Sequence, residues 1–225
     1  MYVKTGAAMA ALGNFATRRH GHRPMVIAAH AALPSLSLWD DLRQILVSDC
    51  DFVAHSLSEP KTAPAQDLVD LIHELGTGPV DLLGWDAGGR TVVQAALAHP
   101  ELVRSITLYD PCIGEVLNHI DGGDAVEADF LWEVFKIVPV PDDTPGDPPA
   151  QMPFPAVTAA SVGKVAVPAL VMTGELSHPR YQIIAEWLAA HVPGAQERVW
   201  PGLGHQGLLG TPEVASEIAS FLTTV

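Results

Sequence analysis

An apolar run, a glycine-bounded turn and a helix-forming stretch follow one another around residue 86. Pro79–Gly84 is predicted to be a buried strand, and Gly88–His99 a helix that ends before a proline. Glycines at positions 84, 88 and 89 allow the backbone to turn sharply and to pass close to a sheet. The pattern predicts that Asp86 lies at the carboxyl end of a strand.

The same alternation of strand and helix runs along most of the chain. Apolar runs predict further strands at Met25–Ala29, Asp51–His55, Ser105–Tyr109, Ala169–Thr173 and Glu197–Trp200. Helical spacing predicts helices at Ala65–Leu75, Val126–Val138, Tyr181–His191 and Pro212–Leu222. Alternating strands and helices predict an α/β fold with a mostly parallel sheet covered by helices on both faces.

One stretch interrupts the alternation. Residues 112–163 contain one predicted helix and then a proline-rich run, Val140–Pro155, which excludes regular helix and central strand. We therefore predict a single core formed by residues 1–111 and 164–225, with residues 112–163 inserted as a lid. A chain of 225 residues is long enough for one such domain.

The composition narrows the range of partners. The chain has 12 Lys and Arg against 26 Asp and Glu, a formal charge of −14, which repels nucleic acid and anionic membrane surfaces. No apolar segment reaches transmembrane length, and Met1–Asn14 lacks the pattern of a signal peptide. The two cysteines, Cys50 and Cys112, are expected to be free thiols in the cytoplasm. The sequence leaves open whether the chain forms a homodimer.

Five polar residues follow predicted strands or their loops. They are His30, Asp86, Asp110, Glu175 and His205. Because the carboxyl ends of parallel strands meet at one edge of a sheet, we expect these side chains to gather there. Two simpler interpretations remain: Asp86 as a helix N-cap, and Asp110 as the first residue of an Asp-Pro turn.

Four stretches, taken in order, resemble the α/β-hydrolase superfamily. They are Val26–His30, Gly84–Gly89, Val167–Glu175, and Pro201–His205 followed by Thr211–Glu213. The resemblance implies an oxyanion corner at His30-Ala31, a nucleophile elbow at Asp86 and a catalytic histidine at His205. An aspartate in the elbow resembles the epoxide hydrolases and the haloalkane and haloacetate dehalogenases.

Chemistry explains why an aspartate elbow selects those substrates. A carboxylate at a helix N-terminus is expected to be ionised and can attack without a base. Attack on an ester carbonyl would give an unfavourable anhydride, whereas attack on an electrophilic sp³ carbon gives a stable alkyl ester. We therefore expect a hydrolase that opens an epoxide or displaces a halide through an ester on Asp86.

Several features depart from both subfamilies. The two lid tyrosines of the epoxide hydrolases are missing, since the tyrosines are Tyr2, Tyr109 and Tyr181, and the dehalogenase Trp after the nucleophile is replaced by Ala87. Ser177 stands where many relatives place the triad acid. Some relatives with an Asp nucleophile take the acid from the end of the next strand, so the resemblance implies Asp110, with Glu175 as the alternative.

The remaining site predictions concern binding. Backbone N–H groups of Ala31 and Ala87 are expected to hold the oxyanion, and His30, Trp85 and Trp132 to contact it or the substrate. The apolar lid residues Phe130, Leu131, Trp132, Phe135 and Ile137 either pack the lid or line an apolar pocket. We expect a small, mostly apolar organic substrate and no cofactor. Because no pair of histidines has metal-ligand spacing with a supporting carboxylate, we expect no metal.

Two other functions remain compatible with the sequence. Asp86 and His205 could act as a general acid and base in a cyclisation, elimination or isomerisation without a covalent intermediate. The chain could also be a non-catalytic binding protein that retains the fold. Fold alone does not choose among these functions.

Overall fold

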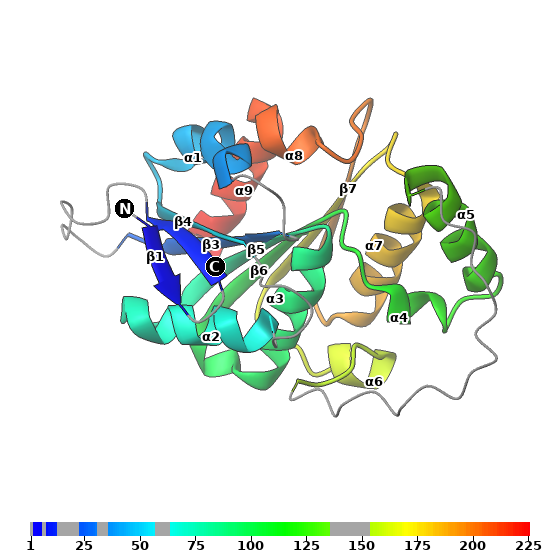
Figure 1. The fold of residues 1–225 in the computed structure, drawn as a ribbon, viewed down its shortest axis with the longest axis horizontal. Coiled ribbons are helices and arrows are strands. Elements are labelled where there is room, and N and C mark those ends of the chain that lie inside the picture. The colour runs from blue at the N-terminus through cyan, green and yellow to red at the C-terminus, as the bar shows by residue number, and fades with distance from the viewer. Residues whose placement is uncertain (1, 6–7, 13–22, 31–35, 57–63, 136–153) are drawn as a thin grey trace.

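The computed structural model describes residues 2–5, 8–12, 23–30, 36–56, 64–135 and 154–225 (Figure 1). The strands are β1 Tyr2–Thr5, β2 Ala8–Leu12, β3 Met25–His30, β4 Asp51–Ser56, β5 Val80–Trp85, β6 Val103–Tyr109, β7 Ala169–Gly174 and β8 Gln196–Trp200. The helices are α1 Asp40–Leu46, α2 Pro64–Leu75, α3 Ala87–Ala98, α4 Gly114–Leu117, α5 Gly123–Phe135, α6 Ala159–Val162, α7 Pro179–His191, α8 Gly207–Gly210 and α9 Pro212–Thr224, with 3₁₀ turns η2 Leu36–Trp39 and η3 Pro100–Leu102.

These strands form one sheet in the order β1-β2-β4-β3-β5-β6-β7-β8. From β4 to β8 all neighbours are parallel, and β1 and β2 add an antiparallel hairpin beside β4. The predicted parallel sheet is confirmed, and the predicted strands and helices are found with their ends shifted by a few residues, while residues 136–138 of the predicted helix Val126–Val138 lie outside the described residues. The hairpin, α1 and the short helices α4, α6 and α8 were not predicted.

The sheet is covered on both faces, as its sequence requires. Every residue of β3, β5 and β7 is buried, which fits strands that read as continuous apolar runs. One apolar cluster joins the sheet to α2, α3 and α7, and a second joins it to α1, α8 and α9. Figure 1 shows α1, α8 and α9 on one side of the sheet and α2 and α3 on the other.

The start of α3 packs directly on the end of β3. A Cβ atom added at Gly88 would lie 1.9 Å from the carbonyl oxygen of Ala29, and one added at Gly84 would lie 2.7 Å from the Cα atom of Gly89. Both distances are far too short for a side chain. The glycines are therefore needed because the backbone of the turn approaches the sheet so closely, as the sequence predicts.

The segment 112–163 contains α4, α5 and α6. Residues 136–153, which include most of the predicted proline-rich run, lie outside the described residues, so the assignment of a lid stays a prediction. The α5 helix packs beside α7 (Figure 1), where buried Arg180 makes an ion pair with Glu127 and lies 4.5 Å above the ring of Phe130. This contact fixes α5 on the core.

Two further predictions concern the thiols and the membrane. Both cysteines are free, as predicted, with Cys50 buried and Cys112 partly exposed. Among the described helices, none is long and apolar enough to cross a bilayer.

Candidate active site

Asp86 lies between β5 and α3 in a backbone conformation that side-chain-bearing residues rarely adopt, with φ 53° and ψ −126°. Its N–H donates to the carbonyl of Tyr109 at 3.3 Å. Its own carbonyl accepts from the N–H groups of Gly89 and Cys112, both at 2.9 Å. Such a conformation costs roughly 1–3 kcal/mol and persists only where its surroundings enforce it. These three hydrogen bonds and the close packing of α3 enforce it here.

The carboxylate of Asp86 does not cap its own helix. Asp86 is the residue before α3, yet its side chain accepts no hydrogen bond from the first turn, so the N-cap interpretation is wrong. Instead, Oδ1 accepts a hydrogen bond of 3.2 Å from the hydroxyl of Tyr181 on α7. The carboxylate is therefore placed toward another element, as a reacting group would be.

His205 and Asp110 are brought together from opposite ends of the sequence. Nδ1 of His205 lies 3.1 Å from Oδ2 of Asp110. When Nδ1 donates to this carboxylate, the lone pair of the neutral ring is on Nε2, which can then act as a base. The pairing that the resemblance implied for these two residues is thus present geometrically.

Asp110 is completely buried at the end of β6 and is also strained, with φ 44°. Besides His205, Ser177 donates to its Oδ2 at 2.5 Å, and Thr173 donates to its Oδ1 at 2.6 Å. The N–H of Gly174 completes the set at 3.2 Å. Four donors hold this carboxylate in one orientation, so it is a fixed acceptor and more than a turn-forming residue.

Glu175, the alternative acid, has different contacts. Its exposed side chain accepts a hydrogen bond of 2.8 Å from the N–H of Gly202, in the loop before His205. No described contact joins it to His205 itself. Ser177, two residues after Glu175, donates to Asp110. Asp110, and not Glu175, is therefore the carboxylate paired with the histidine.

The ring of His205 lies between two aromatic side chains. Tyr181 stacks on it with centroids 4.5 Å apart and planes 16° apart, and Trp85 lies on it at 5.0 Å and 31°. Trp85 also donates from Nε1 to the backbone carbonyl of His205 at 2.9 Å. These contacts fix the imidazole plane. They also connect His205 to Asp86, because Tyr181 touches both residues.

Tyr181 is the main site residue that the sequence analysis missed. Its position at the start of the helix after β7 was a usable signal, since such positions meet at the carboxyl edge of the sheet. Burial and the neighbouring Asp86 raise the pKa of Tyr181 well above its ordinary value. Its hydroxyl therefore stays protonated at neutral pH and remains a hydrogen-bond donor.

The other predicted site residues have varied outcomes. Ala87 begins α3, where first-turn N–H groups have no acceptor within the helix, as an oxyanion donor requires. His30 ends β3 and is fully buried. Trp85 is also buried and donates to the His205 carbonyl, and its role in binding stays a prediction. Ala31 and the side chain of Trp132 lie outside the described residues.

Phe130 packs rather than standing free. Its buried ring contacts Tyr181 edge-on at 5.6 Å and His178 at 5.3 Å. The sequence left two roles open for the apolar residues of 112–163, packing or lining a pocket. Phe130 has the packing role. The ring also brings α5 next to the aromatic stack of the site.

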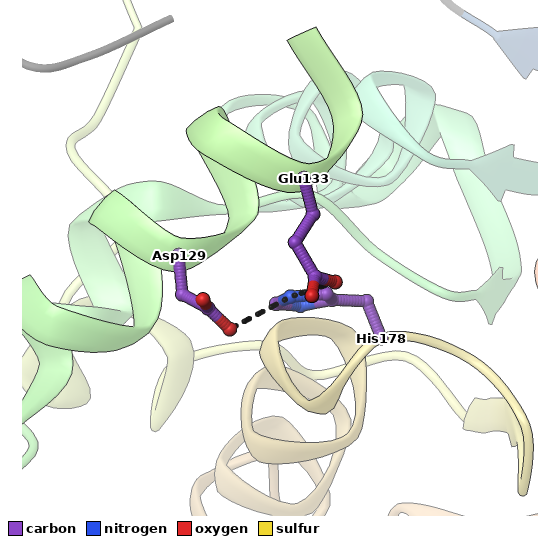
Figure 2. Close-up of side chains that lie close together, drawn as sticks. All are labelled: Asp129, Glu133 and His178. Carbon is purple, nitrogen blue, oxygen red and sulfur yellow. Dashed lines mark ion pairs between the residues drawn. The ribbon is translucent and has the colours of Figure 1, made fainter. Parts of the chain in front are cut away.

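Three potential metal ligands lie close together, although no spacing rule would find them. Asp129 and Glu133 of α5 lie 3.6 and 3.7 Å from Nε2 of His178, the residue before α7 (Figure 2). However, Nδ1 of His178 accepts the N–H of Arg180 at 3.1 Å. The neutral ring must then carry its proton on Nε2, which leaves no lone pair there for a metal. The cluster is better described as an N–H group facing two carboxylates.

Two buried imidazoles lie at the ends of β3 and β4. His30 and His55 are both 0% exposed. Burial is the main cause that lowers the pKa of each to about 4, with the proximity of His55 adding to the effect on His30. Both rings are therefore neutral in the folded protein at neutral pH.

Comparisons with known proteins agree with this architecture. A family model described as "alpha/beta hydrolase fold" matches residues 58–134, roughly a third of the chain including the Asp86 turn. No curated protein sequence matches significantly.

Solved structures match over the whole chain. The carboxylesterase CesB (YbfK) from Bacillus subtilis is 22% identical with a TM-score of 0.70, covering 100% of this chain and 91% of that one. A thermophilic esterase from Thermogutta terrifontis is 19% identical with a TM-score of 0.69, covering 100% and 98%. A serine hydrolase involved in carbazole degradation, CarC, is 16% identical with a TM-score of 0.68, covering 100% and 98%. The chain has the α/β-hydrolase fold, as the sequence predicts.

The buried histidines predict acid sensitivity. The unfolded chain protonates these groups near pH 6.5, whereas the folded chain stays neutral until about pH 4. Because the unfolded state binds more protons in this window, stability falls as the pH falls. We expect a loss of about 2 kcal/mol per histidine between pH 7 and pH 5, measured by urea unfolding. His55→Leu should remove about half of the loss, while exposed His73→Gln should leave it unchanged. An equal loss in all three proteins would contradict this assignment.

Proposed function

We propose that the protein is a hydrolase in which Asp86 is the nucleophile, His205 activates water and Asp110 holds His205. The observation that carries the proposal is the position of the Asp86 carboxylate. It lies at a strained turn, does not cap its own helix, and belongs to the same site as the His205–Asp110 pair. The three similar structures named above are called esterases or a serine hydrolase. An aspartate nucleophile would form an anhydride with an ester, so we assign this chain a different electrophile.

Tyr181 favours an epoxide over an alkyl halide. An epoxide oxygen leaves the carbon as an alkoxide and needs a proton, whereas a halide leaves as a stable anion. The Tyr181 hydroxyl, which is hydrogen-bonded to Asp86 in the resting site, is a suitable donor. It replaces the lid tyrosines that the sequence lacks. The substrate is expected to be small and mostly apolar, since Tyr181, which contacts Asp86, packs against the buried ring of Phe130.

The first step forms an ester. Oδ1 of Asp86 is bonded to Tyr181, so Oδ2 attacks the epoxide carbon. The carbon–oxygen bond of the ring breaks, and the Tyr181 proton passes to the released oxygen. The result is a hydroxyalkyl ester on Asp86 and a tyrosinate.

The second step hydrolyses that ester. Nε2 of His205 takes a proton from water, and the oxygen attacks the carboxyl carbon of Asp86 while the Ala87 N–H stabilises the oxyanion. The ester bond breaks, the leaving alkoxide takes the remaining proton of the attacking water, and a diol and the free Asp86 carboxylate are released. The proton on His205 returns to the tyrosinate of Tyr181 through water. Asp110 stabilises the imidazolium in between.

A second candidate function follows from the same hydrogen bond. Because Tyr181 already donates to Asp86, the two groups could transfer protons to and from a substrate without forming an ester. A cyclase, lyase or isomerase would use the site in this way. The two functions differ in whether Asp86 becomes alkylated.

Blocking water activation should trap the ester. We expect His205→Gln protein treated with styrene oxide to gain the mass of the epoxide on Asp86, seen by intact mass and peptide mapping, because the first step does not need His205. Wild type should not accumulate the adduct, and Asp86→Asn combined with His205→Gln should not form it. A panel of epoxides and alkyl bromides that leaves the variant unmodified would favour the noncovalent function.

Removing the Tyr181 hydroxyl should affect epoxides selectively. In the His205→Gln background, Tyr181→Phe should slow alkylation by styrene oxide about 100-fold, because a general acid is lost. Alkylation by a primary alkyl bromide should change little, since bromide needs no proton. The adduct rate is measured by mass spectrometry, and equal slowing for both electrophiles would show that Tyr181 only shapes the site.

Asp110 and Glu175 provide a matched pair of carboxylates. Asp110→Asn should slow hydrolysis of the ester about 1,000-fold or more, because the imidazolium loses its partner. Glu175→Gln should keep nearly full activity, as its carboxylate contacts only the Gly202 N–H among the described groups. Single-turnover kinetics measures both. Comparable losses in the two variants would contradict the pairing of Asp110 with His205.

A further inference from the structure

His30 carries a buried polar atom without a protein partner. The side chain is 0% exposed at the end of β3, and its Nδ1 accepts a hydrogen bond of 2.8 Å from Nε1 of Trp39. Within the described part of the chain, its Nε2 has no hydrogen-bond partner. An unsatisfied buried group costs about 1–3 kcal/mol, so native proteins rarely leave one without a ligand or water.

Trp39 determines which form of the ring is present. An indole N–H can only donate, so Nδ1 of His30 must keep its lone pair and the proton of the neutral ring lies on Nε2. A second proton on Nδ1 would oppose the indole N–H. The low pKa of His30, caused mainly by burial, agrees with a neutral ring. Nε2 is therefore a fixed, uncharged donor.

The residue that carries this donor lies beside the Asp86 turn. The added Cβ of Gly88 would come within 2.9 Å of the His30 backbone nitrogen, so the start of α3 touches the end of β3. The Trp39 ring lies 6.1 Å from that of Trp85, the residue before Asp86. The negative charge of Asp86 also acts on the His30 ring.

We propose that the Nε2–H of His30 is a catalytic hydrogen-bond donor to an oxygen of the substrate, and that Trp39 is the positioning residue that keeps His30 in the donor form. The inference rests on the proposed function. The donors come from two elements, Tyr181 from α7 and His30 from β3. The bound substrate must then present a hydrogen-bond acceptor, and no donor, to His30.

Nuclear magnetic resonance can test this without turnover. In Asp86→Asn protein with ¹⁵N-labelled histidine, the nitrogen shifts of His30 should report a proton on Nε2 and a bare Nδ1 at pH 7. Addition of styrene oxide should shift the His30 Nε2–H proton downfield. In Trp39→Phe, His30 should become protonated at a higher pH, because no indole N–H opposes the second proton.

Three results would overturn the inference. A proton on Nδ1, or a doubly protonated ring, at pH 7 would remove the donor. A shift at His205 without a shift at His30 would show that the epoxide binds elsewhere in the site, leaving the proposed function intact. No shift at either histidine would exclude the epoxide as a ligand and remove both proposals together.

A rate measurement provides the second readout. In the His205→Gln background, His30→Leu, which removes the donor, should slow alkylation of Asp86 by styrene oxide at least about 10-fold, the equivalent of a 1.4 kcal/mol hydrogen bond. His73→Leu, at an exposed position on α2, is the matched control and should change nothing. An unchanged rate in His30→Leu would contradict the assigned role.

Discussion

The close packing of the Asp86 turn on β3 is the constraint on which the site depends. Only a glycine fits at position 88, and this contact places the start of α3 against the strand end. Among the described residues other than glycine, only Asp86 and Asp110 have positive φ. They follow β5 and β6, whose last residues are paired in register. The buried residues of β5 and β6 supply the packing that offsets this strain.

A chain of ring contacts connects the two sides of the site. It runs through His30, Trp39, Trp85, His205, Tyr181 and Phe130. Each ring limits the tilt of the next, so the orientation of His205 depends on the packing of Trp39 in the core and of Phe130 on α5. A mutation on α5 can therefore disturb the imidazole without touching it. This coupling gives the segment 112–163 an influence on catalysis that does not require it to contact the substrate.

The sequence predicts those parts of the fold that are buried on both sides. β3 and β5 read as apolar runs because helices cover both their faces. The β1–β2 hairpin was missed because Ala8–Leu12 is short and alanine-rich, which gives weak strand propensity. Asp110 was preferred to Glu175 by resemblance alone, since each residue follows a strand. The hydroxyls of Thr173 and Ser177 decide between them, and their direction depends on side-chain geometry.

Contacts between distant elements explain the rest of what the sequence missed. Tyr181 lies 95 residues from Asp86 in the chain, and neither belongs to a motif that includes the other. Proton donors were expected in the predicted lid because the enzymes that the sequence resembles have them there. In the proposed mechanism the donor, Tyr181, comes from the core helix that follows β7. The proximity of two strand ends, and not the identity of the inserted segment, determines which side chains reach Asp86.

An aspartate in place of a serine at the elbow changes the reaction step in which the histidine is needed. A serine needs its histidine in the first step to remove a proton, whereas a carboxylate attacks unaided and leaves the histidine for water. The donor that assists the first step must then come from elsewhere, and it must stay protonated beside a negative charge. A buried tyrosine and a neutral histidine both meet that requirement, because burial disfavours their charged forms. In the proposed mechanism, the burial of these two donors therefore assists the leaving group.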